Sequence, residues 1–146
     1  NLIQKGIIDN EIENIQLIAP VNRDKLLKYY NEANVLFLHL NNISSFEKVL
    51  PSKIFDYGSF DKHILAGVDG IAHTFIKKNL PNAYLFKPGD YKSMIKIIDH
   101  IIDEEQPLID NSLFVEEFSR KKIINSMLDS MISDYSTKYQ KYITRI

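Results

Sequence analysis

The ammonium of Lys53, the hydroxyl of Ser52 and the carboxylates of Glu47 and Asp56 come from one short segment, residues 47–58, which reads EKVLPSKIFDYG. Pro51 suits the first turn of a helix, because the N–H that proline lacks is one that a helix leaves unpaired there. Ser52 and Lys53 would follow at the amino end of that helix, where free backbone N–H groups and the helix dipole favour a phosphate. Asp56 comes one turn later on about the same face, where its carboxylate can accept two hydroxyl hydrogen bonds. A helix end that binds an anion, beside a carboxylate that accepts hydrogen bonds from two hydroxyls, indicates a site for a nucleoside diphosphate.

Apolar runs and helical patterns alternate on both sides of this segment, with short connections. The run 34–40 (NVLFLHL) is almost wholly apolar, which is typical of a strand covered on both faces, as in a parallel sheet. The alternation therefore predicts an α/β fold, with the polar segment after the carboxyl end of a strand, where open sheets bind ligands. Strands are expected at 14–19, 34–40, 63–68 and 83–87, and helices at 1–9, 23–33, 51–60, 71–79, 91–102, 108–118 and from 120 onward, with Asn22, Asp69, Asp90 and Ser119 at helix starts.

The residues VLPSKIFDYGSFDKHILAGVDG resemble the donor-nucleotide-binding segment of the GT-B glycosyltransferases, in particular family 4. Bacterial members of that family often have Pro-Ser-Lys, two apolar residues, an acidic residue and Tyr here. The resemblance continues through NIQLIAPVNRDKLLKYYNEANVLFLHL and FIKKNLPNAYLFKPGD, over about residues 14–101. It implies a Rossmann-like parallel sheet with flanking helices over residues 1–106, as a partial donor-nucleotide-binding domain, and a C-terminal helical extension over 107–146.

The strand order of the resembled domain implies that the sheet of this chain is incomplete. That order is 3-2-1-4-5-6, and this chain would hold about four strands, corresponding to the last four. The first two of these are not neighbours in the complete sheet, so edges would be left unpaired. Either the sheet rearranges, or a missing segment or a partner chain completes it, which includes a second copy of this chain as a homo-oligomer.

The resemblance also implies roles for individual residues. Family 4 enzymes commonly place two glutamates with seven residues between them, and Asp56 matches the second, which takes the ribose hydroxyls. The first, which meets the donor sugar, would fall at Lys48. Glu47 is one residue out of register, and a one-residue change in this loop would bring it into this catalytic role. Lys53 would neutralise phosphate charge, and the backbone of Ser52 would bind the diphosphate. Val21 would touch the nucleobase through its backbone. A surface lysine at 53, a helix-end hydroxyl at 52 and a solvated carboxylate at 56 are the competing interpretations.

The reaction implied by the resemblance is transfer of a sugar from a nucleotide-activated donor to an acceptor hydroxyl, with retention of configuration. Lys53 and the helix amino end would meet the negative charge that develops on the leaving diphosphate. No metal or other cofactor is implied beside the donor, with UDP favoured over GDP. The acceptor would bind a separate amino-terminal domain. We therefore expect a piece of a longer enzyme of cell-surface polysaccharide synthesis, inactive alone. A non-catalytic sugar-nucleotide-binding module and a doubly wound protein-interaction module are the alternatives.

The amino-acid composition limits the classes of molecule and the cellular locations that fit this protein. The 146 residues are 45% apolar and 25% charged, as in an ordinary globular protein with one core. A net charge of −1 argues against the strongly basic face that nucleic-acid binding needs. The absence of cysteine fits a cytoplasmic location. No apolar run reaches the roughly 18 residues of a membrane span, so any membrane contact would be peripheral, at the inner face. The four histidines, at 39, 63, 73 and 100, lack the spacing of a zinc motif.

Overall fold

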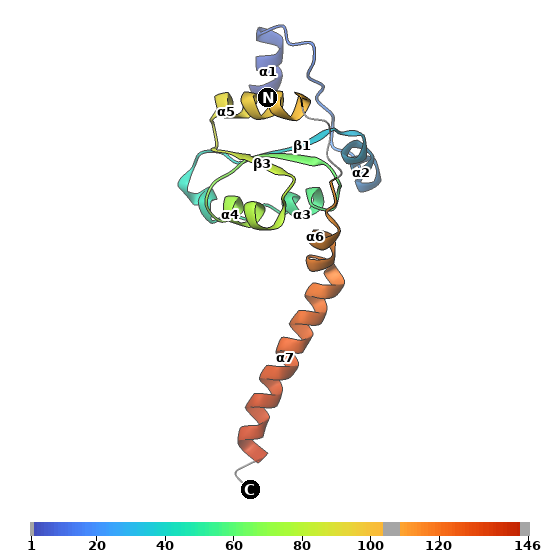
Figure 1. Ribbon diagram of the computed structural model, residues 1–146, viewed down its shortest axis with the longest axis vertical. Coiled ribbons are helices and arrows are strands. Elements are labelled where there is room, and N and C mark those ends of the chain that lie inside the picture. Colours follow the sequence, from blue (N-terminus) through green and yellow to red (C-terminus); the bar gives the residue numbers. More distant parts are fainter. Residues whose placement is uncertain (1, 104–108, 144–146) are drawn as a thin grey trace. The chain divides into compact units, whose positions relative to one another are not determined.

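The computed structural model describes residues 2–103 and 109–143, with side chains described as far as residue 136. The chain divides into two compact units, Asn1–Glu32 and Ala33–Ile146. Figure 1 labels most of the helices and strands of both units.

The first unit contains two helices and a long irregular segment. Helix α1 (Leu2–Asp9) ends in a turn, and helix α2 (Arg23–Glu32) begins after Asn22, whose side-chain oxygen accepts a hydrogen bond from the Lys25 N–H at 3.0 Å. This confirms the predicted cap at Asn22.

The strand predicted at 14–19 is wrong. These residues have no regular structure, and Ile15, Leu17 and Ile18 are all about half exposed. A strand exists only where its backbone pairs with another strand. The alternating pattern was present, but no strand of the described residues pairs with this segment.

The second unit is built on a parallel sheet of three strands in the order β1-β2-β3. These are β1 (Val35–His39), β2 (His63–Gly67) and β3 (Ala83–Phe86), and Phe37 of β1 lies opposite Leu65 of β2, which lies opposite Tyr84 of β3. The central strand β2 is buried along its whole length, which explains why its sequence is apolar without alternation. The expected fold class, an incomplete Rossmann-like α/β sheet, is confirmed, with three strands in place of about four.

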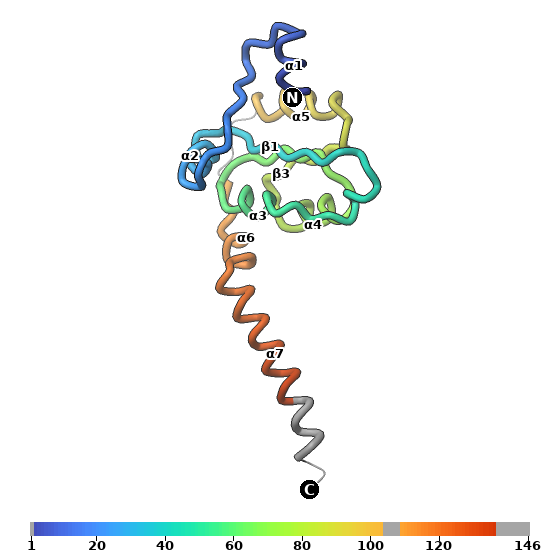
Figure 2. Tube along the Cα trace, turned by 180° about the vertical axis from the view of Figure 1, so that it is seen from behind, coloured from blue at the N-terminus to red at the C-terminus, as the bar shows by residue number. Residues whose placement is uncertain are grey.

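Helices cover the two faces of this sheet. Figures 1 and 2 show α3 (Lys53–Tyr57) and α4 (Gly70–Asn79) on one face and α5 (Tyr91–Asp103) on the other. Helix α3 is shorter than the helix predicted at 51–60, although turn hydrogen bonds continue through Phe60. The Tyr57 hydroxyl fastens α3 to the sheet by donating to the Phe37 carbonyl at 3.1 Å. The buried apolar side chains come from both faces: Leu36, Leu38, Ile54, Tyr57, Ile64, Leu65, Ala66, Val68, Ala72, Ile76, Leu80, Phe86, Ile101 and Phe114.

Two further helices, α6 (Ser112–Glu117) and α7 (Arg120–Ile143), complete the second unit. Asn111 anchors the start of α6, because its side chain donates to the Phe60 carbonyl at 2.7 Å and its backbone N–H donates to the Asp61 carboxylate at 2.9 Å. The boundary predicted between 106 and 107 lies outside the described residues. None of the described helices is long and apolar enough to cross a membrane. Four phenylalanine rings join α6 to α3 and α4, namely Phe55, Phe75, Phe114 and Phe118.

Candidate functional site

The loop after β1 meets the start of α4 at Glu47 and Gly70. Glu47 lies in a short 3-10 helix, η1 (Ser44–Lys48), within this loop. Gly70 has a φ of +61°, and a Cβ atom built on it would lie 2.7 Å from the Glu47 Cα. Such an approach leaves room only for glycine. Asp69 caps α4 by accepting a hydrogen bond from the Gly70 N–H at 2.8 Å, as the sequence predicted. The backbone of Glu47 is therefore packed on the amino end of α4.

Ser52 and Lys53 stand at the amino end of α3, and both are exposed. The first hydrogen bonds of this turn come from the N–H of Ile54, to the Pro51 carbonyl at 3.1 Å, and from the N–H of Phe55. The N–H groups that precede them have no acceptor inside the helix. Ser52 has helical backbone angles, and its hydroxyl does not cap α3. Ser52 therefore lies at the end of the helix, as the competing interpretation expects, but without the hydrogen bond of a side-chain cap.

Asp56 lies within α3, three residues after Lys53, and is half-buried. Residues at this spacing share one face of a helix. Its backbone carbonyl accepts hydrogen bonds from the N–H and the hydroxyl of Ser59, which close the helix. Helix α3 and the residue before it thus contain three of the five expected site residues, Ser52, Lys53 and Asp56, within five positions of the chain.

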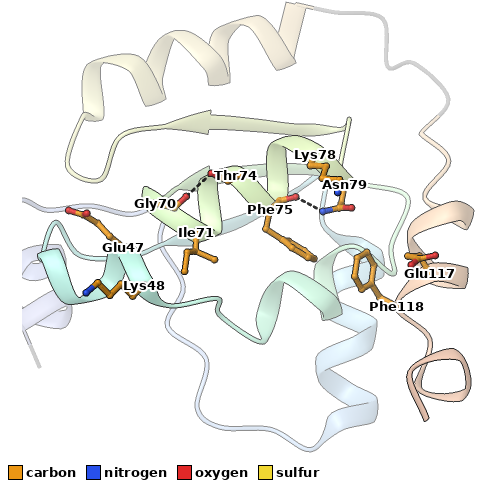
Figure 3. A pocket seen from close by; sticks show the side chains of 10 residues that line it. All are labelled: Glu47, Lys48, Gly70, Ile71, Thr74, Phe75, Lys78, Asn79, Glu117 and Phe118. Carbon is orange, nitrogen blue, oxygen red and sulfur yellow. Dashed lines mark hydrogen bonds between the residues drawn. The ribbon is translucent and has the colours of Figure 1, made fainter. Parts of the chain in front are cut away.

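A cavity of about 860 Å³ runs along α4 and contains Glu47 in its wall. Figure 3 shows Glu47 and Lys48 at one end and Glu117 and Phe118 at the other. The wall includes none of Ser52, Lys53 or Asp56. Val21 belongs to the first unit, and all the residues of the cavity wall belong to the second. The structure therefore brings the α3 residues together, and it puts Glu47 on a different wall beside α4. The full lining of the cavity is Glu47, Lys48, Gly70, Ile71, Thr74, Phe75, Lys78, Asn79, Glu117 and Phe118.

Two residues at the carboxyl ends of the outer strands, His39 and Asp90, were not assigned to the site from the sequence. His39 closes β1 and is exposed, and its Nε2 accepts a hydrogen bond from the Gly89 N–H at 3.1 Å in the turn after β3. Next to this turn, hydrogen bonds from the hydroxyl and the N–H of Ser93 hold the pKa of Asp90 below its ordinary value. The His39 contact spans fifty positions of the chain, and no local pattern signals it.

No family model, curated protein or solved structure matches the chain. What the site can do chemically therefore rests on its own residues. The exposed ammonium of Lys53 and the amides before Ile54 suit an anion, and the Asp56 carboxylate suits hydroxyl donors. Glu47 offers a carboxylate at the carboxyl edge of the sheet, where open parallel sheets bind ligands.

Proposed function

We propose that this chain is the donor-nucleotide-binding part of a retaining glycosyltransferase of the GT-B type. The observation that carries the proposal is the start of α3, where Lys53 is exposed, the Ser52 hydroxyl is not engaged as a cap, and Asp56 follows on the same face. These groups provide an anion-binding helix end and a hydroxyl acceptor that are one helical turn apart. The diphosphate of a sugar nucleotide supplies the matching anion, and its ribose supplies the matching hydroxyl donors.

In this proposal each group has one task in sugar transfer. The amino end of α3 and Lys53 bind the diphosphate and stabilise the negative charge that develops on it as the bond to the sugar breaks. Asp56 accepts hydrogen bonds from the ribose hydroxyls. Glu47, held by the contact of its backbone with Gly70, is directed at the donor sugar.

The acceptor and its binding domain lie outside this proposal, and the chain is inactive by itself. We assign it to cell-surface polysaccharide synthesis on the cytoplasmic side, with peripheral contact at the inner face of the membrane.

Calorimetric titration of the chain with UDP and with GDP tests the proposal. We expect saturable binding, tighter for UDP, that Lys53→Ala and Asp56→Asn each weaken about tenfold or more, because hydrogen bonds to charged groups contribute about 1.5–3 kcal/mol. Lys77→Ala and Asp99→Asn are matched controls, since both residues are exposed on other helices. Binding that the controls weaken as much as the site variants would contradict the proposal, as would no binding by a chain whose circular dichroism shows it folded.

A protein-interaction module is the second candidate. A cavity of about 410 Å³ between β1 and α5 has an almost wholly apolar wall, in which Phe37 is 49% and Ile102 is 73% exposed. Exposed apolar surface of this kind marks interaction sites. Absence of nucleotide binding in the titration above favours this candidate, whereas specific nucleotide binding without sugar transfer by the complete protein favours a non-catalytic sugar-nucleotide module.

A further inference from the structure

An apolar surface runs along one side of α7. Every described side chain of this helix is exposed, from Arg120 to Ser136. Seven large apolar residues among them, with exposed fractions between 44% and 66%, form what we call the α7 stripe: Ile123, Ile124, Met127, Leu128, Met131, Ile132 and Tyr135. At 100° per residue these positions share one half of the helix circumference. The opposite half carries Asn125, Ser126, Asp129, Ser130 and Ser133.

The spacing within the α7 stripe fits another helix. Ile124, Leu128, Met131 and Tyr135 follow one another at intervals of four, three and four residues, which is the a/d seam of a left-handed helix pair. A membrane surface fits less well, because helices that lie in a membrane interface carry Lys and Arg along the polar face. The polar half of α7 between residues 123 and 136 has only uncharged side chains and Asp129.

The charges beside the α7 stripe favour a second copy of the same helix in the opposite direction. Arg120 and Asp134 are two heptads apart, so they occupy the same flank of the seam, with Met127 midway between them. In an antiparallel pair with its two-fold axis near Met127, Arg120 of each copy faces Asp134 of the other. In a parallel pair this flank faces the opposite flank of the partner, so Arg120 would meet Asn125 of the other copy and gain no ion pair. Lys122 is held within its own chain by Glu117.

We propose that two copies of this chain associate through their α7 stripes as an antiparallel helix pair. This interface is closed and isologous, because each stripe faces its own copy across the two-fold axis. It buries side chains that are otherwise exposed to water over 44% to 66% of their area. The proposal does not rest on nucleotide binding.

Sedimentation equilibrium of the full chain tests the association. We expect a reversible dimer whose dissociation constant rises about a hundredfold in Leu128→Asp, because two buried leucines are replaced and each accounts for about a factor of ten. Ser126→Asp is the matched control: it adds the same carboxylate half a turn away, on the polar half, and should leave the dimer unchanged. Far-ultraviolet circular dichroism checks that both variants keep their helix content.

A charge exchange tests the direction of the pair. Arg120→Asp should weaken the dimer about fivefold, because exposed ion pairs contribute about 0.2–1 kcal/mol each and the dimer has two. The double variant Arg120→Asp with Asp134→Arg should restore it. Three results would each overturn the proposal. The chain could remain monomeric at 100 μM, or Leu128→Asp could leave the dimer intact, as expected for a dimer built on the sheet edge. The third is a double variant whose affinity is not restored.

Discussion

Replacing Gly70 with alanine should destabilise the fold for two reasons, one from the backbone conformation of residue 70 and one from a steric clash with Glu47. The φ of +61° is left-handed, which costs an L-residue with a Cβ roughly 1–2 kcal/mol. The added methyl group would also lie 2.7 Å from the Cα and from the carbonyl carbon of Glu47, so the backbone of η1 must move. Forced displacement of well-packed groups costs about 1–3 kcal/mol. We therefore expect Gly70→Ala to lower the free energy of unfolding by about 2–5 kcal/mol, the sum of these two ranges.

Gly89→Ala is the matched control for the cost of the left-handed backbone conformation. Gly89 also has a positive φ, of +84°, but nothing lies within 4 Å of a Cβ built there. Its substitution should therefore cost only the conformational part, about 1–2 kcal/mol. Urea unfolding followed by circular dichroism and by tyrosine fluorescence measures both variants. An effect of Gly70→Ala no larger than that of Gly89→Ala would refute the close approach of Glu47 to α4.

Two further substitutions test contacts that hold the second unit together. Tyr57→Phe removes the hydrogen bond to the Phe37 carbonyl and should lower the free energy of unfolding by about 1 kcal/mol. Tyr91→Phe, at an exposed position, is the control and should leave the free energy of unfolding unchanged. Equal effects of the two substitutions in urea unfolding would contradict this prediction. Asp90→Ala should destabilise the fold at pH 7, because the pKa of Asp90 is lowered in the folded state, so the ionised carboxylate stabilises the fold above its ordinary pKa of 3.8. That difference should shrink as the pH falls through the folded-state pKa, and a difference that stays constant from pH 7 to pH 2 would argue against it.

Features that depend on a few neighbouring residues could be predicted from the sequence. The helix starts at Asn22, Asp69, Asp90 and Ser119 are all confirmed, because a cap is a contact between residues at most three positions apart. The parallel sheet with helices between its strands is confirmed for a similar reason: apolar runs and connection lengths are local properties.

Features that depend on distant partners could not be predicted. The 14–19 segment has the pattern of a strand but no neighbouring strand, and the pattern does not contain that information. Gly58 follows the last residue of α3, and a Cβ built on it would meet the ring of Phe114, so the need for glycine here depends on α6. The contact of Glu47 with Gly70 likewise joins two loops that only the fold brings together. The expected site residues could be named, but not their distribution over α3 and the wall of the α4 cavity.

Gly67, at the end of the central strand, gives the sheet an unusual connection between its outer strands. Because Gly67 has no side chain, the rings of His39 and Phe86 reach toward each other over it, with centroids 6.0 Å apart. His39 also accepts the hydrogen bond from Gly89, so β1 is tied both to β3 and to the turn beyond it, although β1 and β3 share no backbone ladder. An edge strand usually frays by itself. Here, release of the tip of β1 would also remove the hydrogen bond that His39 accepts from the turn after β3, so we expect the carboxyl ends of the two outer strands to be coupled.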